Sequence, residues 1–93
     1  MNSKEIVEID QTLMTAVYAK RPAILLRGEG ALVWDANDRQ YIDCTSSYGV
    51  SFLGHCHPTI VEAIKKQTAR LIACHGSFYN DVRSEVVKKI VEV

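Results

Sequence analysis

The sequence lacks the features that mark several specialised classes of protein. Its 93 residues carry no surplus of charge, because eleven basic and eleven acidic side chains cancel to a formal net charge of zero. This balance gives no electrostatic reason to expect a nucleic acid or an anionic membrane as a partner. No apolar run approaches the roughly 20 residues of a membrane-spanning helix, and residues 1–6 lack the apolar core of a secretory signal. We therefore expect a soluble, cytoplasmic protein.

The sequence also lacks the paired cysteines of a disulfide framework. The three cysteines, Cys44, Cys56 and Cys74, are an odd number and lie far apart in the sequence. Small secreted domains instead carry an even number of cysteines in a paired framework. The spacing therefore favours reduced thiols in a cytosolic setting.

The short length limits what the chain can enclose. Domains of this size bury only about two thirds of the surface that the unfolded chain exposes. The hydrophobic fraction of 47% is that of an ordinary globular protein. A deep, self-contained active site is difficult to build from so few residues.

The spacing of apolar residues in the first half predicts a helix followed by a small sheet. We expect a helix from Ser3, as its N-cap, to about Tyr18. Three strands then form an antiparallel meander, joined by a glycine turn and a polar turn. The strands are expected at residues 23–27, 31–34 and 40–44, and the turns at residues 28–30 and 35–39.

The second half predicts two amphipathic helices. Pro58 suits the first turn of a helix, and apolar residues follow at helical spacing as far as Ile72. Gly76 is the expected residue past its C-terminal cap. Asn80 or Asp81 is expected to cap the last helix.

A long loop separates the sheet from these helices and contains the first candidate for binding. Residues 45–57 lack periodicity and are rich in serine and glycine, and loops of this length often carry function. Tyr48 in this loop suits a core plug and a ligand contact equally well. Tyr18 is a second candidate for ligand contact, whereas Trp34 and Tyr41 suit sheet packing.

The His55-Cys56-His57 run invites chemical interpretations that the sequence disfavours. Imidazole and thiolate bind zinc, but alternate loop residues this close rarely reach one tetrahedral ion, and no second pair lies at zinc-finger spacing. A Cys-His nucleophilic pair lacks an evident orienting group. The RGEG run at residues 27–30 lacks the following helix whose amides would bind a phosphate. We expect no metal site and no catalytic residue here.

The chain contains an ordered series of short motifs, namely RGEG at 27–30, VWD at 33–35, YID at 41–43, GV at 49–50 and LGHCHP at 53–58. This series resembles the N-terminal segment of class III aminotransferases, which depend on pyridoxal phosphate. Within that family the chain is most similar to acetylornithine and ornithine aminotransferases, and to the enzymes of lysine biosynthesis that act on a carrier-linked substrate.

Two sets of residues divide this similarity between the subtypes. SSY at 46–48 and SFYN at 77–80 resemble the ornithine type, whereas GV at 49–50 and FLG at 52–54 resemble the acetylornithine and lysine-pathway type. The resemblance implies an amino-acid donor of the ornithine kind and a 2-oxo acid acceptor such as 2-oxoglutarate.

The resemblance also implies an architecture. Residues 1–93 would be an α+β segment of a fold-type I transferase, namely the N-terminal part of the small domain running into the start of a large α/β domain that is mostly missing. No second complete domain is expected. Such enzymes work as homodimers with active sites near the subunit interface. Their phosphate-binding segment and Schiff-base lysine come later in the chain, so we expect pyridoxal 5'-phosphate to be bound beyond Val93 and the 93-residue chain alone to be inactive.

Two residues, Tyr48 and Tyr18, carry over from the family as site candidates. Tyr48 falls where the family has a residue that gates the pocket, and Tyr18 falls where ornithine-type members have a tyrosine that contacts the distal end of the substrate. A phenol can donate a hydrogen bond to a carboxylate while its ring packs on an aliphatic chain. Ser77 and Phe78 are expected near the pocket or the dimer interface.

Two alternatives stay open at this point. The chain could be a small non-catalytic interaction module or a split-gene product, because its length is short and the last helix has an apolar stripe that the remaining residues can hardly cover. It could also belong to an aminotransferase for 4-aminobutyrate or another ω-amino acid. The residues that select the substrate's carboxylates fall largely outside this sequence.

Overall fold

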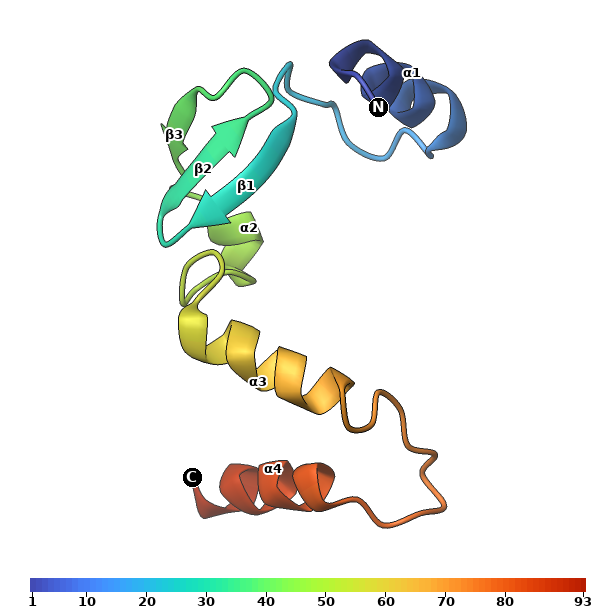
Figure 1. The fold of residues 1–93 in the computed structure, drawn as a ribbon, viewed down its shortest axis with the longest axis vertical. Coiled ribbons are helices and arrows are strands. Elements are labelled where there is room, and N and C mark those ends of the chain that lie inside the picture. The colour runs from blue at the N-terminus through green and yellow to red at the C-terminus, as the bar shows by residue number, and fades with distance from the viewer. The chain divides into compact units, whose positions relative to one another are not determined.

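A computed structural model describes residues 1–93 and divides them into two compact units, Met1–Pro58 and Thr59–Val93. The first unit contains helix α1 (Ser3–Leu13), three strands and a short turn, α2 (Ser46–Gly49). Helix α3 (Pro58–Thr68) begins at the boundary between the units, and α4 (Asp81–Glu92) completes the second (Figure 1). No helix has the length and apolar character that crossing a membrane requires.

Helix α1 begins one residue earlier than predicted and ends sooner. Asn2, not Ser3, is the N-cap, because its side chain accepts a hydrogen bond from the amide of Glu5 at 2.9 Å. The Glu5 carboxylate accepts the amide of Asn2 at 2.8 Å in return, which completes a capping box. The predicted end near Tyr18 is wrong, since Met14 takes extended backbone angles and closes the helix.

The predicted antiparallel meander is confirmed. Strands β1 (Leu25–Glu29), β2 (Leu32–Asp35) and β3 (Gln40–Ile42) form one sheet in the order β1-β2-β3. The predicted turn at residues 28–30 is wrong, because Gly28 and Glu29 lie within β1 and pair with Val33 and Leu32. Only two residues, 30 and 31, therefore connect β1 to β2.

The small core of the first unit lies on β2. Val33 and Asp35 are its buried residues, with exposed fractions of 7% and 6%. The Asp35 carboxylate accepts the amides of Asn37 and Arg39 and, at 2.8 Å, the hydroxyl of Tyr41. Burial acts to raise the pKa of Asp35, but these hydrogen bonds outweigh it and lower the pKa. This carboxylate therefore fixes the predicted polar turn between β2 and β3.

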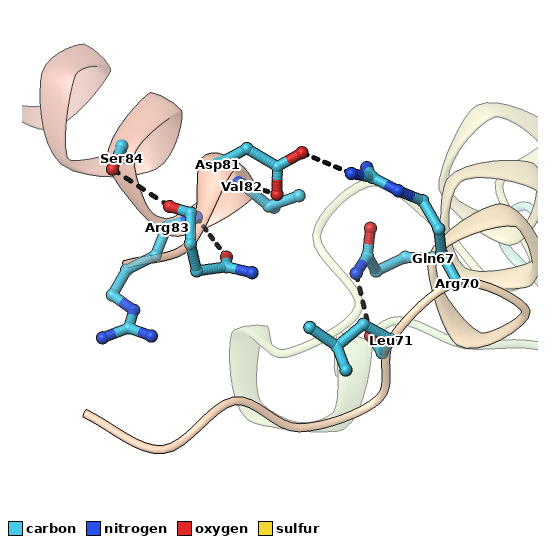
Figure 2. Close-up of polar contacts among 8 residues, drawn as sticks. Gln67, Arg70, Leu71, Asp81, Val82, Arg83 and Ser84 are labelled. Carbon is cyan, nitrogen blue, oxygen red and sulfur yellow. Dashed lines mark hydrogen bonds and ion pairs between the residues drawn. The ribbon is translucent and has the colours of Figure 1, made fainter. Parts of the chain in front are cut away.

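Helix α3 ends earlier than its apolar stripe predicted. Thr68 is its last residue, so the expected continuation to Ile72 and the expected cap at Gly76 are both wrong. The chain tightens after Thr68, because the Arg70 amide bonds the Gln67 carbonyl three residues back. The Gln67 side chain then donates to the Leu71 carbonyl at 2.8 Å and satisfies an acceptor that a longer helix would have used (Figure 2).

Side chains close both ends of the connection between α3 and α4. Asn80 caps α4, as predicted, by accepting the amide of Arg83 at 2.9 Å. Arg70 pairs with Asp81 across the connection (Figure 2). The hydrogen bond and charge of Arg70 lower the pKa of Asp81. Both side chains are more than half exposed, so this pair adds little stability and serves to shape the loop.

Candidate functional site

The turn that presents Tyr48 has a strained backbone. Residues Ser46, Ser47, Tyr48 and Gly49 have consecutive φ values of 48°, 50°, 57° and 88°, all in the left-handed region. Each non-glycine residue in this conformation costs about 1–2 kcal/mol. The long loop predicted from the sequence thus contains one left-handed helical turn. Such strain persists only where surrounding contacts determine it, and it is common at binding and active sites.

Asp43 supplies most of those contacts. Its Oδ1 accepts the Thr45 amide at 2.9 Å, the Thr45 hydroxyl at 2.8 Å and the Ser46 amide at 3.1 Å. Backbone bonds continue from there, with the Tyr48 amide donating to the Thr45 carbonyl and the Ser51 amide to the Ser46 carbonyl, both at 2.9 Å. The carboxylate therefore fixes the entry to the turn.

The second carboxylate oxygen of Asp43 holds His55, beyond the far end of the turn. The distance from His55 Nε2 to Asp43 Oδ2 is 2.8 Å, and the two side chains are 22% and 14% exposed. The hydrogen bond from the Thr45 amide, followed by the one from His55, lowers the pKa of Asp43 to about 2. Asp43 is thus a carboxylate at neutral pH.

His55 packs against two glycines of the β1–β2 hairpin, Gly28 and Gly30. Its backbone pairs with Gly30 in an antiparallel bridge, with N···O distances of 2.8 and 3.0 Å. A Cβ added to Gly28 would lie 2.8 Å from His55 Cβ and Cγ, closer than real side chains approach. Gly54 has a φ of +84°, and a Cβ added there would lie 3.0 Å from the Cα of Gly30. The hairpin and the 53–58 motif therefore pack backbone against backbone.

Sequence reasoning missed this Asp43–His55 pair. It weighed His55 only as a zinc ligand or as part of a Cys-His pair, for which no orienting group was evident. Asp43 lies 12 residues earlier and closes the YID motif. The sequence did contain one signal for the pair: Asp43 lies in the YID motif and His55 in the LGHCHP motif, and both motifs belong to the same family resemblance.

The predicted substrate-contacting tyrosines are both exposed. Tyr48 is 96% exposed at the left-handed turn, and Tyr18 is 77% exposed in the segment between α1 and β1. Neither hydroxyl takes part in a hydrogen bond within the chain, so both can donate to another molecule. One hollow of the first unit, about 700 Å³, is lined by α1, residues 22–24 and residues 35–37 and includes neither tyrosine.

Ser77 and Phe78 lie together in the second unit. They line a hollow of about 320 Å³ with residues 79, 80, 83 and 84. The His75 ring accepts the Ser77 amide at 3.2 Å, and the His75 carbonyl accepts the Phe78 amide at 3.1 Å. The Phe78 side chain is 68% exposed.

The remaining members of the histidine and cysteine run stay apart from this network. Cys56 and His57 are exposed, and Cys56 has a φ of +53°. The chain contains no cluster of three or more His, Cys, Asp or Glu side chains that could hold a metal ion.

Comparison with known proteins identifies the family. The sequence model of the family described as aminotransferase class-III matches residues 14–93. The chain belongs to the class III aminotransferases. The resemblance that the motifs indicated is therefore confirmed.

Individual relatives agree with this assignment. The chain is 41% identical to an acetylornithine aminotransferase of Methanopyrus kandleri, over 99% of this chain and 23% of the relative. It is 43% identical to a [LysW]-aminoadipate semialdehyde transaminase of Deinococcus radiodurans, over 85% of this chain and 18% of the relative. The crystal structure of acetylornithine aminotransferase from Elizabethkingia anophelis superposes with a TM-score of 0.92 at 36% identity, covering 99% of this chain and 24% of that one.

The class III match covers a limited part of these relatives. The chain spans about a fifth to a quarter of their length. Its four helices and three-stranded antiparallel sheet are the segment of the aminotransferase fold that the superposition covers.

The residues present do not form a pyridoxal phosphate site by themselves. A lysine that holds this cofactor must reach it within an enclosed site, whereas all six lysines of this chain are exposed. Lys20 pairs with Asp10, and Lys65 with Glu62, on helix surfaces. This class III segment therefore offers candidates for substrate contact and none for cofactor binding.

Proposed function

We propose that this chain forms the N-terminal part of a pyridoxal-phosphate-dependent aminotransferase. The enzyme transfers an amino group from N-acetylornithine, ornithine or a lysine-pathway equivalent to a 2-oxo acid such as 2-oxoglutarate. It acts in the cytoplasm as a homodimer. Residues 1–93 supply the beginning of the small domain and run into the start of the large one. The family match and the activities named for the relatives support this proposal.

The observation that carries the proposal is the left-handed turn at residues 46–49. Backbone strain that is held in place by a partly buried carboxylate is typical of functional sites. The turn presents a phenol that is 96% exposed and has no partner within the chain. In the complete enzyme Tyr48 contacts the substrate and gates the pocket.

Tyr18 contacts the distal end of the same substrate. Its hydroxyl can donate to a carboxylate or acyl oxygen, while its ring packs on the methylene groups of an ornithine-like chain. Ser77 and Phe78 lie at the edge of the pocket or at the dimer interface. The cofactor is held by segments that the relatives have in addition, and it supplies the electron sink of the reaction.

The test uses a complete enzyme, made by joining residues 1–93 to the remaining segments of the Methanopyrus kandleri relative, and called here the fused enzyme. We expect Tyr48→Ala to raise the KM for the amino donor roughly tenfold, because a hydrogen bond and ring packing worth about 1.4 kcal/mol are lost. Tyr48→Phe should raise it less, since the ring remains. Initial rates at varied donor concentration give these values.

Tyr79→Ala is the matched control. Tyr79 is as exposed as Tyr48 and lies in a loop, but the proposal gives it no contact with substrate. Its KM should stay within twofold of the parent. Equal effects of Tyr48→Ala and Tyr79→Ala on KM would contradict the role of Tyr48.

A further inference from the structure

We propose that Asp43 and His55 form a positioning pair that holds the left-handed turn in shape and thereby sets how Tyr48 meets the substrate. The inference rests on the proposed function for the contact made by Tyr48. It adds two residues to which neither the sequence nor the family comparison gave a role. Neither of them touches the substrate.

Asp43 and His55 lie at the two ends of the loop that contains Tyr48. Asp43 directly follows β3, and His55 is fixed to the hairpin by its backbone bridge to Gly30. The side-chain contact between them, 2.8 Å long, therefore joins the two ends of the loop that contains Tyr48. Closing a loop at its base reduces the number of conformations that the residues inside it can adopt.

The Asp43 carboxylate bonds the entry of the turn with one oxygen and His55 with the other. Oδ1 of Asp43 accepts three hydrogen bonds from Thr45 and Ser46, which lie at the entry to the strained turn. Oδ2 accepts the bond from His55. His55 therefore fixes the orientation of the carboxylate whose other oxygen fixes the turn. Loss of His55 frees the carboxylate to rotate and weakens the bonds at the entry.

The fit of His55 against Gly28 also holds the pair together, and this steric contact does not depend on charge. Gly28 leaves room for the imidazole, since an added Cβ would lie 2.8 Å from His55 Cβ and Cγ. An alanine at this position must displace His55 from Asp43 or displace the hairpin. Gly28→Ala and His55→Phe are thus independent ways to separate the same pair.

The first measurement is amide hydrogen exchange in the fused enzyme, which does not require activity. In His55→Phe and in Gly28→Ala, we expect the amides of residues 46–51 to exchange roughly tenfold faster, while those of β2 keep their rates. His57→Phe and Gly76→Ala are the matched controls, because His57 is exposed and an added Cβ at Gly76 meets nothing within 4 Å. Unchanged exchange at residues 46–51 in both test variants would overturn the proposal.

The second measurement separates positioning from general stability. We expect His55→Phe to raise the KM for the amino donor several-fold with kcat within twofold of the parent. In a Tyr48→Ala background the same substitution should add nothing, because its effect passes through Tyr48. Effects on KM that multiply in the double variant would show that His55 acts by another route and would refute the positioning role.

A conservative variant guards against simple loss of folding. Asp43→Asn keeps an oxygen for the Thr45 and Ser46 amides and an amide group that can donate to His55 Nε2, but it lacks the charge, so its exchange rates and KM should lie between those of the parent and those of Asp43→Ala. Asp43→Ala should behave like His55→Phe. If Tyr48→Ala leaves KM unchanged, the proposed substrate contact fails, while the exchange rates still decide whether the pair holds the turn.

Discussion

Two aspartates of this chain each accept several hydrogen bonds and thereby fix the backbone of a turn. Asp43 is the clearest case, because a single carboxylate accepts four hydrogen bonds and joins two motifs that are separate in the sequence. Asp35 performs a similar task for the turn between β2 and β3. The small sheet has little apolar core, and in both turns hydrogen bonds to a carboxylate hold the backbone in place. The local backbone geometry therefore depends on the charge of that carboxylate.

That charge predicts a pH dependence at residue scale. The pKa of Asp43 is about 2 in the folded chain, below its ordinary value of 3.8. A lowered pKa gives stability that is fully present above about pH 4 and is lost as the pH falls toward about 2. We therefore expect the protection of residues 46–51 from hydrogen exchange, corrected for intrinsic rates, to decline over that range.

Asp43→Ala is the comparison for this pH dependence. Its protection at residues 46–51 should be low at every pH and should lack the decline between about pH 4 and 2. A decline of equal size in Asp43→Ala would assign the pH dependence to other carboxylates.

For the helices and strands, the sequence predicted which elements form and in what order better than it predicted the residues at which they begin and end. The meander was predictable because glycine, proline and alternating apolar residues mark strands and turns over short distances. The N-cap of α1 was placed at Ser3 because serine and asparagine are both good caps, and only the bond from Glu5 to Asn2 distinguishes them. The end of α3 depends on side-chain bonds of Gln67 and Thr68 that composition does not reveal.

The candidate site divides in the same way. Tyr48 and Tyr18 were predictable as candidates, since an aromatic in a polar loop and a family motif are both visible in the sequence. The left-handed turn and the Asp43–His55 contact were not, because they depend on backbone angles and on a contact between residues 12 positions apart.

The cap of α1 gives a prediction at element scale. Asn2→Ala removes the side-chain oxygen that accepts the Glu5 amide and should destabilise α1 by about 1 kcal/mol. Ser3→Ala is the matched control, because the Ser3 side chain forms no hydrogen bond, and it should change stability by only a few tenths of a kcal/mol. Amide exchange of residues 5–10 measures both. A larger effect of Ser3→Ala would restore the cap predicted from the sequence.

At the scale of the whole molecule, the chain exposes most of its large apolar side chains. Val33 is the one buried hydrophobic residue, whereas Val86, Val87, Ile90 and Val91 of α4 are between 51% and 78% exposed. Extended exposed apolar surface marks faces that pack against other protein. This agrees with a segment that spans about a quarter of the length of its relatives.

The whole-molecule prediction concerns the 93-residue chain alone. Titration with pyridoxal phosphate should produce no saturable change in the cofactor's visible absorbance, because every lysine is exposed and none lies in an enclosed site. The fused enzyme, treated in parallel, should show saturable binding. A saturable change with the chain alone that disappears on adding ornithine would contradict the assignment of cofactor binding to other segments.

The most direct test of the central claim compares amino donors in the fused enzyme. Initial rates are measured with N-acetylornithine, ornithine and 4-aminobutyrate, each at varied concentration with 2-oxoglutarate as acceptor. We predict that Tyr48→Ala lowers the ratio of kcat/KM for N-acetylornithine or ornithine to kcat/KM for 4-aminobutyrate, and that Tyr79→Ala leaves this ratio unchanged. An inactive fused enzyme, or a ratio in Tyr48→Ala equal to that of the parent, would contradict this prediction.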